Sequence, residues 1–181
     1  LIKKNPGTIS LGQGVVYYGP PQKVILKISK LNPSADYHVY SEVQGITKLR
    51  SIISEKLMSE NKINLNEEHE VIVTAGSNMG FMNAVLAIAD PNDEIILLRP
   101  YYFNHEMAIN MINCKSVIVD TDLHYQPCME KIVTAITSHT KAIVTVSPNN
   151  PSGAVYERKM LEEINKLCKE KGIYHISDEA Y

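Results

Sequence analysis

The stretch "EIILLRPYYFNHEMAINMINCKSVIVD" at residues 94–120 decides the fold class. It begins with an apolar run, 94–99, and ends with a β-branched run, 115–120, and both runs are typical of buried strands. Between them, residues 101–112 carry apolar side chains at helical spacing, and Pro100 breaks the first run. A strand, a helix and a second strand in this order predict two parallel strands joined by a crossover helix.

The same alternation extends on both sides of this stretch. We expect further strands at 70–74, 141–147 and 173–177. We expect further helices at 78–89, 129–136 and 157–172, the last ending on Gly172. Short β-branched runs separated by helices predict the α/β class, with a mostly parallel sheet and helices on both of its faces.

The first third of the chain follows a different pattern. Residues 1–21 are rich in Gly and Pro and predict an extended arm. A short helix is expected over 22–31, followed by a polar loop over 32–45. Residues 47–61 place apolar side chains at helical spacing and predict an amphipathic helix.

Composition excludes several classes of protein. Apolar residues make up 44% of the 181 and charged residues 21%, which is typical of a globular domain. A net charge of −2 gives no electrostatic basis for binding nucleic acid or an anionic membrane, and no apolar run approaches the ~20 residues of a membrane span. Three scattered cysteines, Cys114, Cys128 and Cys168, argue against a disulfide framework or a metal site. We therefore expect a cytoplasmic protein without a metal.

Polar clusters follow the predicted strands at the sheet edge where α/β proteins bind ligands. The first is "VTAGSNMG" at 73–80, in which Gly76 permits a tight turn and Ser77 and Asn78 open a helix. Free backbone N–H groups at a helix start form an anion site. The alternative is an ordinary helix cap, because Ser and Asn are favoured at that position.

Two more clusters follow later strands. In "RPYYF" at 99–103, a tyrosine could lie flat on a ligand ring or simply pack in the core. In "SPNNPSG" at 147–153, two prolines make a rigid loop that presents Asn149 and Asn150. That loop is either a plain turn or a ligand contact, and its length favours the contact.

The fourth cluster is "SDEAY" at 177–181. A carboxylate at the end of a buried strand is costly without a partner, so Asp178 could hold a cation or a protonated ring nitrogen. It could also cap a helix, as could Ser177. Together, the four clusters offer an anion site, an aromatic ring that can stack, a side-chain amide and a carboxylate. This combination suits a flat, anionic, protonatable heteroaromatic ligand.

These stretches occur in one order and spacing that resembles a known family over nearly all 181 residues. The chain resembles the class I/II aminotransferases, the fold-type I enzymes that use pyridoxal 5′-phosphate (PLP). The matching motifs are "LGQG" (11–14), "YSEVQGITKLR" (40–50), "VTAGSNMGF" (73–81), "RPYYF", "SPNNPSGAVY" (147–156) and "SDEAY". The series is specific, whereas any one motif alone would be weak.

The resemblance implies roles for the residues that hold the cofactor. The backbone around Gly76, Ser77 and Asn78 would cradle its phosphate, and Tyr102 would stack on its pyridine ring. Tyr40 resembles the tyrosine that reaches the phosphate of a neighbouring subunit. This last role implies a homodimer with shared active sites.

The resemblance also implies roles at the reacting centre. Asn150 and Tyr181 would hydrogen-bond the phenolic oxygen of the cofactor, and Asp178 would pair with its ring nitrogen. Gly14 lies where the arm of the family brings backbone close to the substrate carboxylate. We therefore expect Asp178, Tyr181 and Asn150 to be catalytic.

On this reading, residues 1–45 form the N-terminal arm and first helix, part of a small domain and of the dimer contact. Residues 46–181 form part of the large PLP-binding domain, incomplete on its C-terminal side. In this family the Schiff-base lysine and the arginine that binds the substrate carboxylate lie downstream of the motif that ends at Tyr181. The chain alone is therefore expected to be unable to catalyse.

The expected activity is transfer of an amino group between an amino acid and a 2-oxo acid, through a Schiff base and a quinonoid intermediate. One alternative is another PLP reaction on the same scaffold, namely elimination, replacement or side-chain cyclisation. A non-catalytic PLP-binding regulatory module is a further alternative. A nucleotide-binding α/β protein is disfavoured because the chain lacks its Gly-rich motif.

Overall fold

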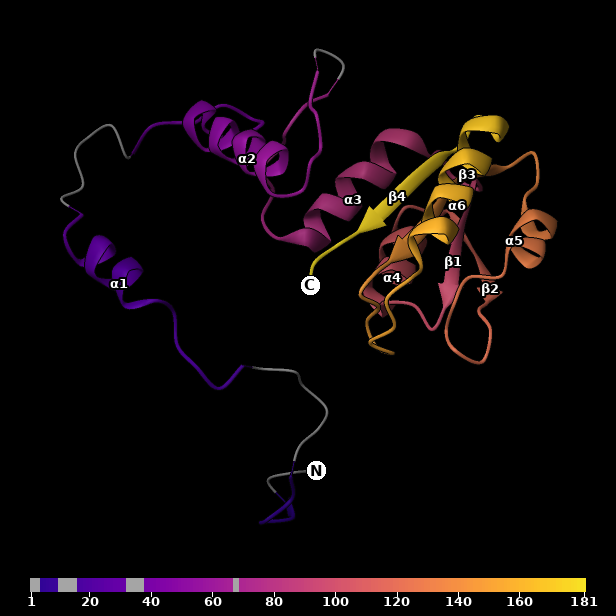
Figure 1. Ribbon diagram of the computed structural model, residues 1–181, viewed down its shortest axis with the longest axis horizontal. Coiled ribbons are helices and arrows are strands. Elements are labelled where there is room, and N and C mark those ends of the chain that lie inside the picture. Colours follow the sequence, from indigo (N-terminus) through magenta and orange to yellow (C-terminus); the bar gives the residue numbers. More distant parts are fainter. Residues whose placement is uncertain (1–3, 10–15, 32–37, 67–68) are drawn as a thin grey trace. The chain divides into compact units, whose positions relative to one another are not determined.

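A computed structural model describes residues 4–9, 16–31, 38–66 and 69–181 (Figure 1). The chain divides into two compact units, Leu1–Ser41 and Glu42–Tyr181. The candidate site lies in the second unit.

Helices and strands alternate through most of the second unit. Its helices are α2 Thr47–Ser59, α3 Ser77–Ile88, α4 Phe103–Met111, α5 Met129–Ala135 and α6 Arg158–Lys171, and α1 Gln22–Ser29 belongs to the first unit. The strands are β1 Glu94–Arg99, β2 Lys115–Asp120, β3 Thr140–Val146 and β4 Tyr174–Asp178. Gly172 ends α6 in the left-handed conformation, φ 66°, which glycine adopts without a steric penalty.

The four strands form one parallel sheet in the order β2-β1-β3-β4. The carboxyl ends of β3 and β4 lie side by side, because Val146 pairs with Asp178. This register brings the loop that follows β3 next to the segment that follows β4.

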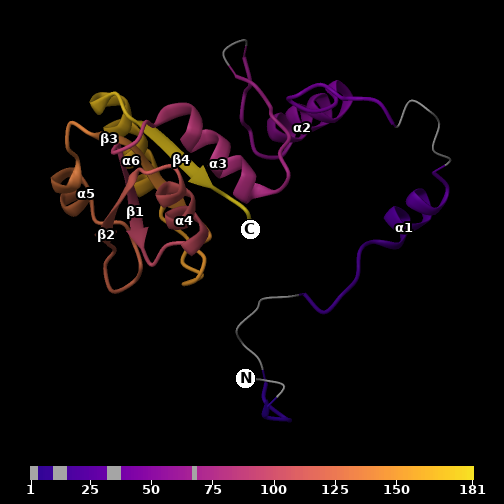
Figure 2. The ribbon, with the colours of Figure 1, turned by 180° about the vertical axis from the view of Figure 1, so that it is seen from behind.

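Helices cover both faces of the sheet, as the views from two sides show (Figures 1 and 2). On one face, Ile95 and Leu97 of β1 pack in a core with side chains of α3 and α4. On the other face, Ile96 and Leu98 of the same strand pack with α5 and α6. The alternation along β1 follows from the two-residue period of a strand. The predicted α/β class, with a parallel sheet and helices on both faces, is confirmed.

The strand predicted at 70–74 is wrong for the residues that the structure describes. This segment joins no β-ladder. Its backbone bonds run to a loop and a side chain: Val73 N donates to Gln44 O over 2.9 Å, and Arg50 Nε donates to Val71 O over 2.7 Å. Alternating apolar residues predict a strand, but a strand also needs a partner, and these bonds supply none.

Within the first unit, α1 buries none of its residues. In the ranges described, no helix is both long and apolar enough to cross a membrane.

Candidate active site

The start of α3 has the geometry of an anion site. Gly76 occupies the N-cap position with φ 83°, and in this part of the chain no side chain forms a capping bond to α3. Gly76 O accepts from Gly80 N over 3.2 Å, whereas Ser77 and Asn78 are exposed. A Cβ built on Gly76 would meet no heavy atom within 4 Å. The N–H groups of the first turn therefore face open space at the positive end of the helix dipole.

This geometry bears on the two interpretations of the "VTAGSNMG" stretch. An ordinary cap requires the Ser or Asn side chain to lie at the N-cap, but the backbone places Gly76 there and puts both side chains inside the helix. Ser77 and Asn78 therefore do not cap α3 with their side chains, and an uncapped helix start can accept an anion.

Asp178 ends β4 and has a partner that we did not predict. Its Oδ2 lies 3.1 Å from Nε2 of His105, and the side chains are 16% and 3% exposed. Its Oδ1 accepts from Ala180 N over 3.1 Å. Each carboxylate oxygen therefore has one partner and can accept a further hydrogen bond.

His105 lies in a closely packed aromatic environment on α4. Its ring stacks on Phe81 with centroids 4.0 Å apart, and Tyr102 meets it edge-on at 5.4 Å. Burial lowers the pKa of His105, against the opposing effect of Asp178. A neutral ring whose Nε2 carries the proton can donate to Asp178, and that tautomer leaves Nδ1 as an acceptor. Among the described residues, Nδ1 has no hydrogen-bond partner.

Tyr102 precedes α4 and is half-buried. Its hydroxyl accepts from Asn104 Nδ2 over 2.7 Å, and its edge contact with His105 fixes the ring from the other side. Tyr102 thus contacts His105, which in turn contacts Asp178.

Asn150 and Tyr181 meet at the end of the chain shown. Asn150 Nδ2 donates to the Tyr181 hydroxyl over 3.3 Å, although the two residues come from the loops after different strands. Tyr181 is 77% exposed. The structure therefore brings these two predicted residues together on an open surface.

Several of these residues line one of two hollows in the surface. A cleft of about 380 Å³ is lined by Ser77, Gly80 and Phe81 of α3 and by the segment from Ile176 to Ala180, which includes Asp178. A second hollow of about 360 Å³ lies among Pro148, Asn149, Asn150, Pro151, Gly153 and Tyr181. Ser77 in the first turn of α3 and Asp178 at the end of β4 thus line one cleft.

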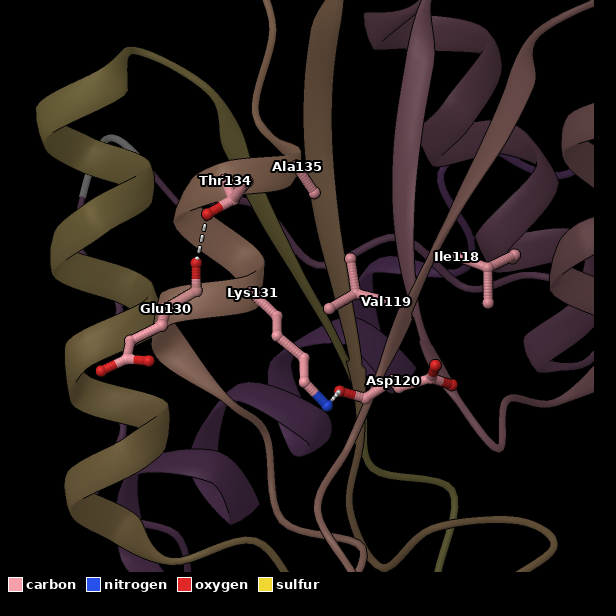
Figure 3. A pocket seen from close by; sticks show the side chains of 7 residues that line it. All are labelled: Ile118, Val119, Asp120, Glu130, Lys131, Thr134 and Ala135. Carbon is pink, nitrogen blue, oxygen red and sulfur yellow. Dashed lines mark hydrogen bonds between the residues drawn. The ribbon is translucent and has the colours of Figure 1, made fainter.

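A further pocket of about 500 Å³ lies between β2 and α5 (Figure 3). Two of its charged groups have partners: Lys131 Nζ donates to Asp120 O over 3.3 Å, and the Asp120 carboxylate pairs with Arg99. None of the predicted site residues lines it. We therefore do not assign the active site to this pocket.

Two predicted residues, Gly14 and Tyr40, do not belong to the second unit. Gly14 lies outside the described residues. Tyr40 belongs to the first unit and is fully exposed. Their roles stay predictions, as do the roles of Gly76, Ser77, Asn78, Tyr102, Asn150, Asp178 and Tyr181.

His105 is the residue that sequence reasoning missed. It stands three positions after Tyr102, so helical spacing places it on the same face of α4, and that spacing was the available signal. Its contact with Asp178 depends on packing between α4 and β4, which the sequence alone does not reveal.

The parallel α/β sheet carries Asp178 at its carboxyl edge, which is where proteins of this class bind their ligands. The family model for aminotransferase class I and II matches residues 6–181, and the chain belongs to that family.

Particular relatives agree with this assignment. The chain is 34% identical to an aromatic aminotransferase of Arabidopsis thaliana over 96% of the chain and 44% of the relative. It is 31% identical to the aspartate aminotransferase of Thermotoga maritima over 100% of the chain and 48% of the relative. The crystal structure of a Thermotoga maritima aspartate aminotransferase superposes with a TM-score of 0.87 at 30% identity, covering 98% of this chain and 48% of that one. The chain thus spans under half the length of these relatives.

Proposed function

We propose that the protein to which this chain belongs is a PLP-dependent aminotransferase that moves an amino group between an amino acid and a 2-oxo acid. The observation that carries the proposal is the cleft of about 380 Å³ that Ser77 and Asp178 line together. Membership of the family supports it, and so do the relatives named for aromatic, aspartate and alanine substrates.

The residues present fit PLP on two independent observations. The uncapped start of α3 offers backbone N–H groups and open space for a phosphate beside Gly76, Ser77 and Asn78. The Asp178 carboxylate keeps capacity for one more donor, which suits a protonated ring nitrogen. A helix start and an acceptor that line the same cleft suit a flat ring that carries a phosphate.

Asp178 would act by holding a proton on that ring nitrogen. A nearby carboxylate favours the protonated form of a base, and each pKa unit corresponds to about 1.4 kcal/mol. When bound, the protonated cofactor supplies the electron sink that stabilises negative charge at the substrate Cα. His105 would keep the carboxylate oriented by donating to Oδ2.

The remaining residues would bind and orient the ring. Tyr102 would stack on its face, because its ring is already fixed by Asn104 and His105. Asn150 and Tyr181 would donate to its phenolic oxygen, and their mutual bond places the two donors side by side.

The wider assembly follows from the same proposal. We infer a homodimer in which Tyr40 reaches the phosphate in the neighbouring subunit and Gly14 lies beside the substrate carboxylate. In the same terms, residues 1–45 belong to the arm and dimer contact and 46–181 to the PLP domain. Among the described residues, Cys114, Cys128 and Cys168 are free thiols, which supports a reducing, cytoplasmic location.

The test uses the full-length protein loaded with PLP. Aspartate, alanine or phenylalanine is added without a 2-oxo acid, and the cofactor is then extracted with acid and identified by chromatography. An aminotransferase converts bound PLP to pyridoxamine 5′-phosphate in this half-reaction, and 2-oxoglutarate restores PLP.

Two other results would contradict the proposal. Release of ammonia with PLP unchanged would indicate elimination or replacement chemistry instead. Failure of the full-length protein to retain PLP through gel filtration would remove the cofactor assignment as well.

A further inference from the structure

The buried side chain of Asn149 connects two loops of the candidate site. Its Nδ2 donates to Pro100 O over 3.0 Å, and its Oδ1 accepts from Ser152 N over 3.0 Å and from Ser152 Oγ over 2.7 Å. Pro100 belongs to the loop that leads into Tyr102, and Ser152 belongs to the loop that carries Asn150. One amide therefore bonds to both loops at once.

The backbone of Asn149 closes its own loop. Its N–H donates to Ala154 O over 2.8 Å, and its carbonyl accepts from Gly153 N over 2.8 Å. With the side-chain bonds, every polar group of a residue that is only 4% exposed has a partner. Such a residue fixes the backbone on either side of it, and Asn150 is its immediate neighbour.

We propose that Asn149 is a positioning residue that holds the loop carrying Asn150 against the loop carrying Tyr102, and so sets the distance between the amide and the aromatic ring. The inference rests on the proposed function, because Asn150 and Tyr102 are assigned there to the cofactor. It concerns a different residue, to which the proposed function assigns no contact with cofactor or substrate.

The chemistry of the contacts explains why an amide is needed. The Pro100 carbonyl requires a donor, and the Ser152 groups require an acceptor. Aspartate would keep the acceptor but turn a second oxygen toward the Pro100 carbonyl. An apolar side chain would leave groups of both loops unpaired, which costs more than a hydrogen bond contributes when both partners are present.

The test compares Asn149→Asp with a matched control, Thr145→Val, in the full-length protein. Thr145 is fully buried on the face of β3 that packs against α6. Its replacement by valine removes one hydrogen bond, the 2.9 Å bond between Thr145 Oγ1 and His175 Nε2. Both variants remove a buried polar contact from the same segment of chain, but only the first touches the two site loops.

Three quantities are measured for the parent and both variants: the melting temperature of the apoprotein, the dissociation constant for PLP, and the pH titration of the absorption of bound PLP. We expect both variants to melt below the parent. Only Asn149→Asp should weaken PLP binding, by about tenfold for one lost hydrogen bond, and shift the absorption titration.

Equal PLP affinity and an equal titration in Asn149→Asp and Thr145→Val would overturn the inference and leave Asn149 a purely structural residue. A parent protein that binds no PLP would instead overturn the proposed function, so the two failures are distinguishable. If Asn149→Asp does not fold, Ser152→Ala is measured in its place. Ser152→Ala removes the hydrogen bond from Ser152 Oγ to Asn149 Oδ1 and should weaken PLP binding by about threefold. A PLP affinity equal to that of the parent would overturn the inference.

Discussion

The two ends of the candidate site are built differently. At one end, Asp178 is held by His105, whose ring contacts Phe81 of α3 and Tyr102 at the start of its own helix. At the other end, Asn150 and Tyr181 share one 3.3 Å bond, and Tyr181 is 77% exposed. The carboxylate end packs against the hydrophobic core through Phe81, whereas Tyr181 at the amide end is on the surface.

The difference indicates what each end contributes. Side chains fixed by core packing keep one orientation whether or not a ligand is present, so the carboxylate end is suited to tuning the chemistry of a bound ring. Exposed side chains joined by one bond are ordered by what they bind, so the amide end is suited to binding. Substitutions at the two ends should therefore affect turnover and affinity differently.

Asp178→Asn in the full-length protein tests this contrast with the largest expected effect. The amide retains a hydrogen-bonding side chain of the same size but removes the charge that favours a protonated ring nitrogen. Since an opposite charge shifts a neighbouring pKa by 1–3 units, turnover should fall about 10- to 1,000-fold while much of the PLP is retained. Steady-state kinetics and the PLP content of the purified variant measure the two quantities. Turnover close to that of the parent would remove Asp178 from its assigned role.

His105 offers a smaller effect at the same end. His105→Leu removes the donor to Asp178 Oδ2 and should lower turnover about tenfold, as expected for a hydrogen bond to a charged group. His105→Gln keeps an N–H donor and should restore part of that loss. If both variants behave alike, the histidine acts through packing with Phe81 and not through the carboxylate.

The pH dependence of stability gives a second measurement on His105. Burial lowers the pKa of the folded His105, so the unfolded chain takes up a proton at a higher pH than the folded one does. The folded state is then favoured above the unfolded pKa of about 6.5 and loses stability as the pH falls below that value. The free energy of unfolding of the parent should therefore fall between pH 7.5 and 5.5, and His105→Gln should flatten part of this fall.

His175 serves as the control for that measurement. Burial also lowers its pKa, but it bonds to Thr145 and Asn165 on the opposite face of β4. His175→Gln should flatten the pH dependence of stability without lowering turnover. A loss of turnover equal to that of His105→Gln would mean that the site has no special dependence on His105.

Much of the fold followed from residues that act locally. The runs 94–99 and 115–120 were predicted as strands and match β1 and β2 residue for residue, because each run has the apolar pattern of a buried parallel strand and the two pair with each other. Gly172 was predicted to end a helix and does so, because its role depends on its own backbone conformation. The segment 70–74 was misjudged because a strand also depends on a partner, which local pattern does not specify.

The candidate site divides in the same way. The motifs indicated Asp178 and the α3 start, since strand ends and helix starts are marked in the sequence. The histidine beside Asp178 and the bonds of Asn149 were not foreseen, because they depend on how α4 packs against β4 and how two loops meet. Local chemistry can be predicted from sequence, but contacts between distant segments require the fold.

Substitutions at the amide end should act on affinity, with a smaller effect than at Asp178. Asn150→Ala removes one neutral donor and should weaken PLP binding by about tenfold, and Tyr181→Phe should weaken it by about threefold. Turnover at saturating PLP should change less than in Asp178→Asn. Equilibrium titration of the apoprotein with PLP measures the affinities. A loss of turnover with unchanged affinity would reverse the proposed division of labour between the two ends.

The smallest effect is expected for Ser152→Thr. The hydroxyl of Ser152 donates to Asn149 Oδ1 over 2.7 Å, and threonine keeps that hydroxyl while adding one methyl group to a half-buried position. PLP affinity should therefore stay within about twofold of the parent, as expected for a substitution that breaks no buried contact. An effect as large as that of Ser152→Ala would show that the loop tolerates no change in packing. The hydrogen bond would then not be what positions Asn150, and the amide end would be as tightly packed as the carboxylate end.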